Sequence, residues 1–413
     1  MPQNRRKPFA IAAVLIAVLI AATAAYFALC KDASKPPIIA TGGAYSLVVI
    51  DGKLYAAGDN EYGQLGLRGG SETNRRSLFT PVPLSEDKEI IALAAGEAHS
   101  LALTSEGKVW ATGANGNGQL GLGASYPETF MLVRSLKDKK IVALAASKAN
   151  SLALTSEGRV YATGANGNGE LGFGDGKARV VFTPVSSLRD KKIARIAAGV
   201  YCSFAIGENG DVYATGYNFS AQLGLGDDYS NRNVFTLVKS LEGKKIVAVA
   251  AGENHSLALG ADGKVYAAGW NGNGQLGFGD DERDVFTEVA SLSDKNVTQV
   301  AAGYRHSLAL DSDGKVYATG DNGRGQLGLG YGGENDFGEA MRRKVFTLVS
   351  SLEGKKIVAV AAGKTQSVFG GSHSLALTSD GKLYATGANE FGQLGVGDQD
   401  DRNVFTLVAL PDR

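Results

Sequence analysis

One phrase returns seven times along this chain: a glycine, one variable residue, an asparagine and, two residues later, a segment that reads Gly-Gln-Leu-Gly in most copies. Five of the six intervals between copies are 51 to 55 residues long, and the last is 67. A period near 50 residues predicts repeated supersecondary units that bury their faces only against each other. The lead glycines are Gly58, Gly113, Gly164, Gly216, Gly269, Gly320 and Gly387.

Each repeat predicts four short antiparallel strands, which the fifth copy shows most clearly. Residues 244–252 form a run of small and β-branched residues, and residues 256–259 alternate between apolar and small side chains. An Asp-Gly hairpin turn leads to a third run at 265–269, and a fourth run lies at 285–289. Seven such units predict an all-β, seven-bladed β-propeller of four-stranded antiparallel blades. No helical periodicity follows residue 30.

The repeats begin at a strand-like run at 37–42 and end just after the run at 405–408. Seven whole units are therefore present, and we expect the ring to close. Whether the first strands complete the last blade is a question of phase, which the sequence leaves open.

The first 37 residues differ from the repeats and predict a membrane anchor. An uncharged run of 22 residues extends from Phe9 to Cys30, behind the basic residues Arg5, Arg6 and Lys7. A helix of that length crosses a hydrocarbon core of about 30 Å. We expect a basic cytoplasmic N-terminus (1–8), a transmembrane anchor or uncleaved signal (9–30), a spacer (31–37) and the propeller (38–413).

The basic cluster precedes the apolar run, so the positive-inside rule predicts that the propeller lies outside the cytoplasm, in a periplasm or at a cell surface. A secretory peptide cleaved near Ala24 is one alternative, although the run is longer than is usual for such peptides. A lipoprotein signal that uses Cys30 is another, and the bulky Leu29 fits that cleavage poorly.

The charge balance argues against nucleic acid as a partner. The chain has 42 basic and 42 acidic residues, so its formal charge is zero. Binding to nucleic acid begins with a field of basic residues that meets the phosphates, and this sequence has none. The two cysteines, Cys30 and Cys202, do not make a disulfide framework.

The repeat resembles the regulator of chromosome condensation repeat. The resemblance rests on Ala-Ala-Gly-x-x-His-Ser-Leu-Ala-Leu, on Asp/Glu-Gly-Lys-Val-Tyr-Ala-x-Gly-x-Asn and on Gly-Gln-Leu-Gly, and it covers residues 38–408. It implies that family's seven-bladed propeller. Members include a guanine-nucleotide exchange factor that docks on nucleosomes, a plant ultraviolet-B photoreceptor, a secreted bacterial β-lactamase inhibitor and many scaffolds. A shared fold transfers none of these functions by itself.

Two of these family functions meet obstacles in the sequence. The exchange factor works through a β-wedge inserted into one blade, and copies one to five have no comparable insertion. The photoreceptor needs clustered tryptophans, whereas this chain has only Trp110 and Trp270. The secreted inhibitor agrees with the expected compartment, but no local motif marks its target contacts.

Most apparent chemical motifs repeat with the blades, which indicates structural roles. The histidines His99, His255, His306 and His373 share one repeat position, and a serine follows that position in every copy. Ring symmetry spreads such residues around the axis, so we expect each histidine to bond a neighbouring backbone. The G-x-G-x-x-G match at 116–121 leads to a strand instead of opening a helix, so it does not indicate a dinucleotide site. We therefore expect no catalytic residue, no metal and no cofactor.

Six copies carry an arginine three residues before the phenylalanine of the fourth strand, and acidic residues precede several of them. Such a rim either receives a charged partner or forms ion pairs within and between blades, each worth about 0–1 kcal/mol when exposed. The ion-pair interpretation is favoured. The arginines are Arg76, Arg179, Arg232, Arg283, Arg343 and Arg402.

The symmetry breaks in the last two copies. The sixth copy lengthens the loop between its third and fourth strands through residues 331–341, and the seventh lengthens the turn between its first and second strands through 364–372. Both connections leave from one face of a blade, and insertions on one face often form a binding surface. Tolerated loop growth is the alternative explanation. The candidate partner-binding residues are Tyr331, Phe337, Phe369, Arg232, Arg283, Arg343 and Arg402.

Taken together, these patterns predict a non-enzymatic, monomeric protein-binding platform with an unknown protein partner, anchored in the membrane through Phe9 to Cys30. An anchored or secreted enzyme inhibitor is the first alternative. Exchange-factor, carbohydrate-binding and hydrolytic propellers are less favoured, because tryptophan is scarce and no polar residue stands out as confined to one or two blades of the central channel.

Overall fold

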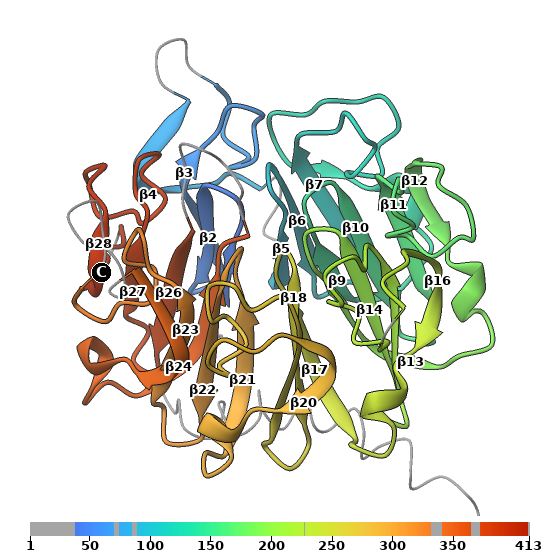
Figure 1. Cartoon of the computed structure of the whole chain (residues 1–413). Helices are drawn as coiled ribbons and strands as arrows, with labels where there is room; N and C mark the ends of the chain where they lie inside the picture. The colour runs from blue at the N-terminus through green and yellow to red at the C-terminus, as the bar shows by residue number, and fades with distance from the viewer. Residues whose placement is uncertain are drawn as a thin grey trace, which may run out of the picture.

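Seven antiparallel sheets of four strands surround a central channel (Figure 1). The computed structural model of the chain describes residues 38–69, 74–84, 89–226, 228–331, 341–364 and 372–411. The expected cytoplasmic N-terminus, transmembrane anchor and spacer lie outside these ranges. No helix within them combines the length and the apolar character that crossing a bilayer requires. The prediction of an all-β propeller with seven four-stranded blades is confirmed.

Each blade is one contiguous stretch of chain whose strands A to D follow in order from the channel outward. The A strands are β1 (Ile38–Thr41), β5 (Ile90–Ala95), β9 (Ile141–Ala146), β13 (Ile193–Ala198), β17 (Ile246–Ala251), β21 (Val297–Ala302) and β25 (Ile357–Ala362). The B strands are β2 (Tyr45–Ile50), β6 (His99–Thr104), β10 (Asn150–Thr155), β14 (Cys202–Gly207), β18 (His255–Gly260), β22 (His306–Asp311) and β26 (His373–Thr378).

The outer half of each blade is built in the same way. The C strands are β3 (Lys53–Asp59), β7 (Val109–Gly113), β11 (Val160–Gly164), β15 (Val212–Gly216), β19 (Val265–Gly269), β23 (Val316–Asp321) and β27 (Leu383–Gly387). The D strands are β4 (Arg75–Pro81), β8 (Met131–Leu132), β12 (Arg179–Pro184), β16 (Arg232–Leu237), β20 (Arg283–Glu288), β24 (Arg342–Leu348) and β28 (Arg402–Leu407). We number the blades 1 to 7 in chain order.

Short 3-10 turns follow the D strands, although the sequence showed no helical periodicity there. Each turn buries one leucine in the gap between two blades, which three residues achieve without any longer helical pattern. The turns are η1 (Arg134–Leu136), η2 (Ser186–Leu188), η3 (Lys239–Leu241), η4 (Ala290–Leu292) and η6 (Ser350–Leu352).

The ring closes by packing the first blade directly against the last. Strand β1 lies beside β25, as each A strand lies beside the next elsewhere in the ring. Leu78 of β4 forms a β-bridge with Val396 in the C–D loop of blade 7. Figure 1 shows the blue and red ends of the chain side by side. The first strands therefore stay in their own blade, which answers the question of phase.

The hydrophobic core lies between adjacent blades. Phe204 of blade 4 meets Phe286 of blade 5 edge to face, with ring centroids 6.5 Å apart, in a cluster shared by the two blades. Phe79 of blade 1 and Leu375 of blade 7 share the cluster that closes the ring. Burying each such side chain contributes about 1.5–3 kcal/mol. No blade buries its faces alone, which is the physical meaning of the repeat.

The repeated Gly-x-Asn…Gly-Gln-Leu-Gly phrase shapes the C–D loop of each blade. In blade 5 the Asn271 side chain accepts the Leu276 N–H at 2.8 Å and donates to the carbonyls of Gly279 and Asp281, both at 2.9 Å. The last glycine of the phrase needs a positive φ and leaves room for the next blade: a Cβ on Gly224 (φ +67°) would lie 2.3 Å from Phe286. The asparagine thus holds the two ends of the loop together.

Candidate functional site

The A–B turns and the C–D loops leave the ring on the same face, because consecutive strands of each blade are antiparallel. We call this the AB/CD face. Backbone hydrogen bonds join its A–B turns at six of the seven junctions between blades, including the bond from Lys364 N–H to the Gly42 carbonyl (3.4 Å) where blade 7 meets blade 1. Between blades 3 and 4 the Lys148 ammonium makes the link, to the Tyr201 hydroxyl. The face therefore rests on a ring of linked turns.

The side chains on that ring differ between neighbouring blades, although the residues around them repeat. The first turn residue lies just behind the repeated glycine that ends the A strand (a serine in blade 3), and it is different in kind from blade to blade. This variation inside a constant frame was visible in the sequence, but our prediction concentrated on the two insertions and missed it. The seven residues are Gly43, Glu97, Lys148, Val200, Glu253, Tyr304 and Lys364.

Exposed aromatic side chains gather on the AB/CD face. In the described ranges four tyrosine, phenylalanine or tryptophan residues are exposed, namely Tyr62 (53%), Tyr126 (69%), Phe219 (63%) and Tyr229 (44%). All four lie in C–D loops, and none lies on the opposite face. Aromatic rings offer large apolar area at a low cost in conformational entropy, so this distribution is typical of a binding surface.

A hollow of about 560 Å³ opens on this face where blades 7, 1, 2 and 3 meet. Burial raises the pKa of Asp59 in the hollow, against the hydrogen bonds that its carboxylate accepts from Glu61 N–H and the Gln64 amide. Burial also raises the pKa of Glu97, and the nearby Lys148 opposes that shift. Two carboxylates thus lie at the boundary between water and protein.

Two further polar–aromatic groups continue around the mouth. In blades 3 and 4, Lys148 donates to the Tyr201 hydroxyl at 3.1 Å, and the ring of Tyr201 lies 5.9 Å from that of Tyr217. In blades 5 and 6, the Tyr304 hydroxyl donates to Glu253 at 2.5 Å, and Arg305 pairs with the same carboxylate at 3.3 Å. These groups are internally satisfied, whereas the hollow is open.

A lysine of one blade reaches into the channel, which contradicts our expectation that no polar residue there is confined to one or two blades. A cavity of about 250 Å³ is lined by the alanines that end the A strands and by Lys364 of blade 7. The Lys364 ammonium donates to the Ala198 carbonyl of blade 4, across the channel. Burial lowers the pKa of Lys364 to about 8. One repeat-breaking residue thus ties opposite walls together.

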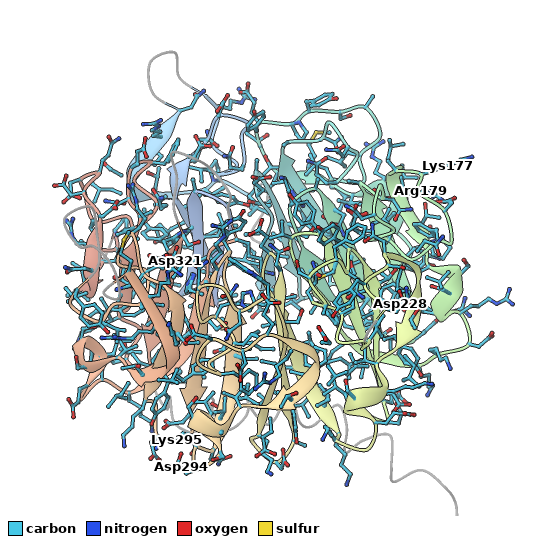
Figure 2. All side chains as sticks on the ribbon, viewed as in Figure 1. Lys177, Arg179, Asp228, Asp294, Lys295 and Asp321 are labelled. Atoms are coloured by element: carbon cyan, nitrogen blue, oxygen red, sulfur yellow. The ribbon has the colours of Figure 1, made fainter. Side chains whose placement is uncertain are left out.

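The predicted arginine rim lies on the AB/CD side, but its members are engaged within their own loops. Arg232, Arg283 and Arg402 pair with Asp228, Asp281 and Asp398 at 2.6, 3.3 and 2.5 Å. Figure 2 shows Asp228 of blade 4 and, on the neighbouring C–D loop of blade 3, Arg179, which occupies the repeat position of Arg232. These contacts agree with the ion-pair interpretation.

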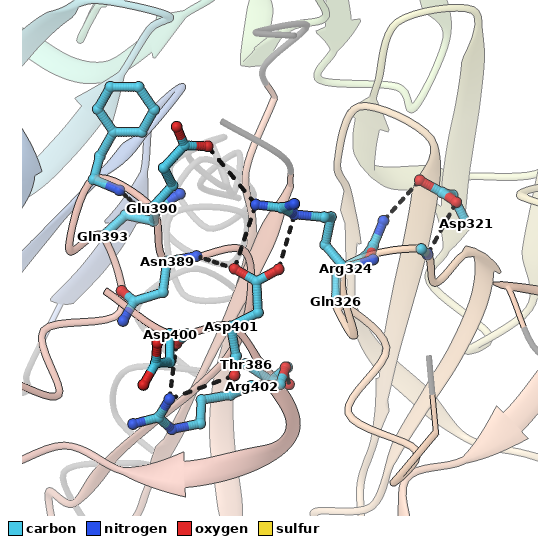
Figure 3. Close-up of polar contacts among 12 residues, drawn as sticks. Asp321, Arg324, Gln326, Thr386, Asn389, Glu390, Gln393, Asp400, Asp401 and Arg402 are labelled. Carbon is cyan, nitrogen blue, oxygen red and sulfur yellow. Dashed lines mark hydrogen bonds and ion pairs between the residues drawn. The ribbon is translucent and has the colours of Figure 1, made fainter. Parts of the chain in front are cut away.

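Between blades 6 and 7 the cation comes from a different position. Arg324 reaches from the C–D loop of blade 6 to Asp401 of blade 7 at 2.8 Å and to Glu390 at 3.8 Å, as Figure 3 shows. Arg343, the rim arginine of blade 6, instead bonds the Tyr331 hydroxyl and lies 4.4 Å from the centre of its ring. The other two candidate residues, Phe337 and Phe369, lie outside the described residues.

The histidines serve structure, as predicted, but each bonds a side chain and not a backbone group. His255 Nε2 lies 3.0 Å from Ser307 Oγ of the next blade, and that hydroxyl donates to the Gln275 carbonyl at 2.8 Å. The serine proton is thereby used, so the imidazole must donate through Nε2–H. The same arrangement links His99 to Ser151, His306 to Ser374 and His373 to Ser46.

Burial lowers the pKa of these histidines to about 3 for His99, His255 and His306 and about 4 for His373. They are neutral at pH 7 and act as locks between blades. No group of three or more metal-ligating side chains gathers in the ranges that the structure describes.

The fold and this face define a class: β-propellers that display a variable surface on a repeated frame. The RCC1-like domain matches residues 28–369, and the regulator of chromosome condensation (RCC1) repeat matches residues 357–393 and 380–412. The chain belongs to the family of RCC1-like domain proteins.

Its relatives have diverse roles. The chain is 33% identical over 385 residues to the ultraviolet-B receptor UVR8 of Arabidopsis thaliana, which covers 91% of the chain and 83% of the receptor. It is 32% identical over 353 residues to the E3 ubiquitin-protein ligase HERC2 of Homo sapiens, covering 84% of the chain but only 7% of the ligase. The structure of yeast RCC1 (Prp20) bound to Kap60 matches with a TM-score of 0.75 and 26% identity, over 90% of the chain and 85% of that protein.

Proposed function

We propose that this chain is a non-enzymatic protein-binding platform whose partner docks on the AB/CD face. The observation that carries the proposal is the gathering of every exposed aromatic side chain of the described residues on that face. The polar residues of the A–B turns, which differ from blade to blade, give the same surface its specificity. The yeast relative was solved in complex with another protein, Kap60, which agrees with a protein-binding role.

The candidate residues from the sequence belong to this proposal in a modified role. The arginines Arg232, Arg283 and Arg402 shape the outer rim through pairs in their own loops. Tyr331 and Arg343 form one stacked unit beside blade 6. We assign the partner contacts to the inner aromatic residues and keep Phe337 and Phe369 as further contact candidates.

The proposed test uses the purified full chain as bait for proteins from native membranes, quantified by mass spectrometry. The double variant Phe219→Ala/Tyr229→Ala removes two exposed rings from the face. The matched control Leu348→Ala/Leu407→Ala removes two exposed apolar side chains from the far ends of D strands. We expect the face variant to lose partners that the control retains. Equal recovery with both variants overturns the proposal.

We further propose that the propeller is displayed outside the cytoplasm on the anchor from Phe9 to Cys30. The support is the apolar length of that run and the basic cluster before it. Protease treatment of intact cells is expected to remove the propeller. Protection of the propeller, with digestion only after lysis, contradicts this topology.

A further inference from the structure

The hollow between blades 7, 1, 2 and 3 is lined by aromatic, charged and amide side chains. Its walls include the rings of Tyr62, Tyr126 and Phe391. The first two are exposed by 53% and 69%, so their faces are free to contact a ligand. Aromatic faces attract cations, with about 0.5–1 kcal/mol for each exposed contact and more when water is excluded.

The structure already shows one such contact beside the hollow. The guanidinium of Arg75 lies 4.1 Å from the centre of the Phe391 ring, and it donates to the Glu390 carbonyl at 3.4 Å. Phe391 therefore accepts a guanidinium on one side. The same ring also lines the open hollow.

The charged side chains of the hollow are unequal in number. Asp59, Glu61 and Glu97 supply three carboxylates, and Lys148 supplies one ammonium, which is bonded to Tyr201. Within the described residues none of the three carboxylates forms an ion pair. Arg75 and Lys148 offset only part of the desolvation of Asp59 and Glu97, because the pKa of each carboxyl stays raised. An incoming cation would offset the rest.

A buried amide adds a second, neutral recognition group. Gln119 is 4% exposed and lines the hollow, and its Oε1 accepts the Asn117 N–H at 3.0 Å. In blade 1 the equivalent Gln64 gives its amide protons to Asp59 at 2.8 Å. Blade 2 has Ala114 in place of that aspartate, so the Gln119 amide lacks the carboxylate partner that Gln64 has in blade 1. It is placed to donate to a peptide carbonyl.

We propose that the hollow binds a lysine or arginine side chain presented by the protein partner, with its charged head at Asp59 and Glu97 and against the ring faces of Tyr62 and Tyr126. The proposal rests on the platform function above and adds the chemistry of the partner: a basic segment. The Gln119 amide holds the backbone of that segment.

Fluorescence anisotropy with a fluorescein-labelled hexa-arginine amide tests this directly, with the purified full chain at 150 mM salt and hexa-citrulline as the uncharged probe. Asp59→Asn/Glu97→Gln is expected to weaken binding about tenfold, equivalent to about 1.4 kcal/mol. Glu97→Gln alone is a second variant, because that side chain makes no hydrogen bond to the part of the chain that the structure describes. Thermal melts by circular dichroism establish that each variant is folded.

Two further variants separate a built site from general attraction. Tyr62→Ala/Tyr126→Ala keeps the charge and is expected to weaken binding about two- to fivefold through the lost cation–π contacts. Asp138→Asn/Glu157→Gln removes two charges on the opposite face and is expected to change the affinity less than about twofold, because salt screens distant charges.

Equal losses in all variants, full affinity in the aromatic variant, or no hexa-arginine binding overturn the inference. If hollow variants keep the membrane partner while Phe219→Ala/Tyr229→Ala loses it, the platform stands and the basic-segment proposal alone fails.

Discussion

The four buried histidines make the stability of this propeller depend steeply on pH. The chain has four histidines in all, and each is fully buried in a lock between blades. Their folded-state pKa values, about 3 to 4, lie below the ordinary value of 6.5. Below pH 6.5 the unfolded chain therefore binds more protons than the folded chain. Stability is fully present above pH 6.5 and is lost as pH falls toward the folded-state values.

The size of the effect follows from the same values. At pH 5, protonation of one histidine in the unfolded chain lowers the free energy of unfolding by about 2 kcal/mol. Four histidines give about 8 kcal/mol, against a total stability of about 5–15 kcal/mol for a typical domain. We expect the propeller to approach unfolding near pH 5. Each histidine contributes at most about 1.4 kcal/mol per pH unit to the slope.

Urea unfolding of the purified full chain, followed by far-ultraviolet circular dichroism between pH 7.5 and 5, measures this slope. The variant His255→Asn/His306→Asn removes half of the titrating groups and inserts the residue that blade 3 already carries as Asn150. We expect its slope to be about half that of the parent chain. Cys202→Asn perturbs the equivalent position of blade 4 without removing a histidine.

The reasoning is refuted if the histidine variant keeps the full slope, or if Cys202→Asn reduces it equally. Carboxyl groups also titrate toward pH 5: burial raises the pKa values of Asp59 and Glu97, which opposes the histidine effect. Their contribution is common to all the variants, so the difference between slopes belongs to the histidines.

Three further predictions concern the repeated frame. Asn271→Ala removes three hydrogen bonds from a buried loop and is expected to lower the free energy of unfolding by about 3 kcal/mol in urea titrations. A loss below about 1 kcal/mol contradicts the view that these bonds stabilise the loop. Gly224→Ala places a Cβ 2.3 Å from Phe286 and is expected to cost about 3 kcal/mol, whereas Gly243→Ala, also at positive φ but with open space around it, costs about 1. Similar melting temperatures for the two alanine variants speak against this. Arg402→Gln breaks a solvent-screened ion pair and is expected to change the free energy of unfolding by less than about 1 kcal/mol. A larger loss in the same titration would show that the rim ion pairs stabilise the fold, contrary to our expectation.

The sequence predicts the fold well because every structural requirement is stated seven times. The C strand of blade 5 spans residues 265–269, as predicted, and the other strands of that blade begin and end within two residues of their predicted limits. The hydrogen-bond partner of the histidines was predicted wrongly, because the serine that accepts this bond lies in the next repeat. For His99 that serine is 52 residues further along the chain. The sequence pattern within one repeat does not reveal which residues of neighbouring repeats come into contact.

The candidate residues from the sequence and the surface that the structure presents overlap little, for a related reason. Repetition drew attention to the arginine rim, which pairs within its own loops, and to insertions whose phenylalanines lie outside the described residues. The single-residue departures at Glu97, Lys148 and Lys364 carry more of the chemistry, since ring closure brings them around one channel mouth. These residues lie near one another only because the ring closes, and no local sequence motif marks them.

Site-specific photo-crosslinking in native membranes tests the central claim, that the AB/CD face is the binding face. Benzoyl-phenylalanine placed at Tyr126 or Phe219 probes that face, and the same group at Asp138 or Leu407 probes the opposite side. We predict one crosslinked partner band from both face positions and none from the other two. The same band from Asp138 or Leu407, without one from Tyr126 or Phe219, contradicts the account.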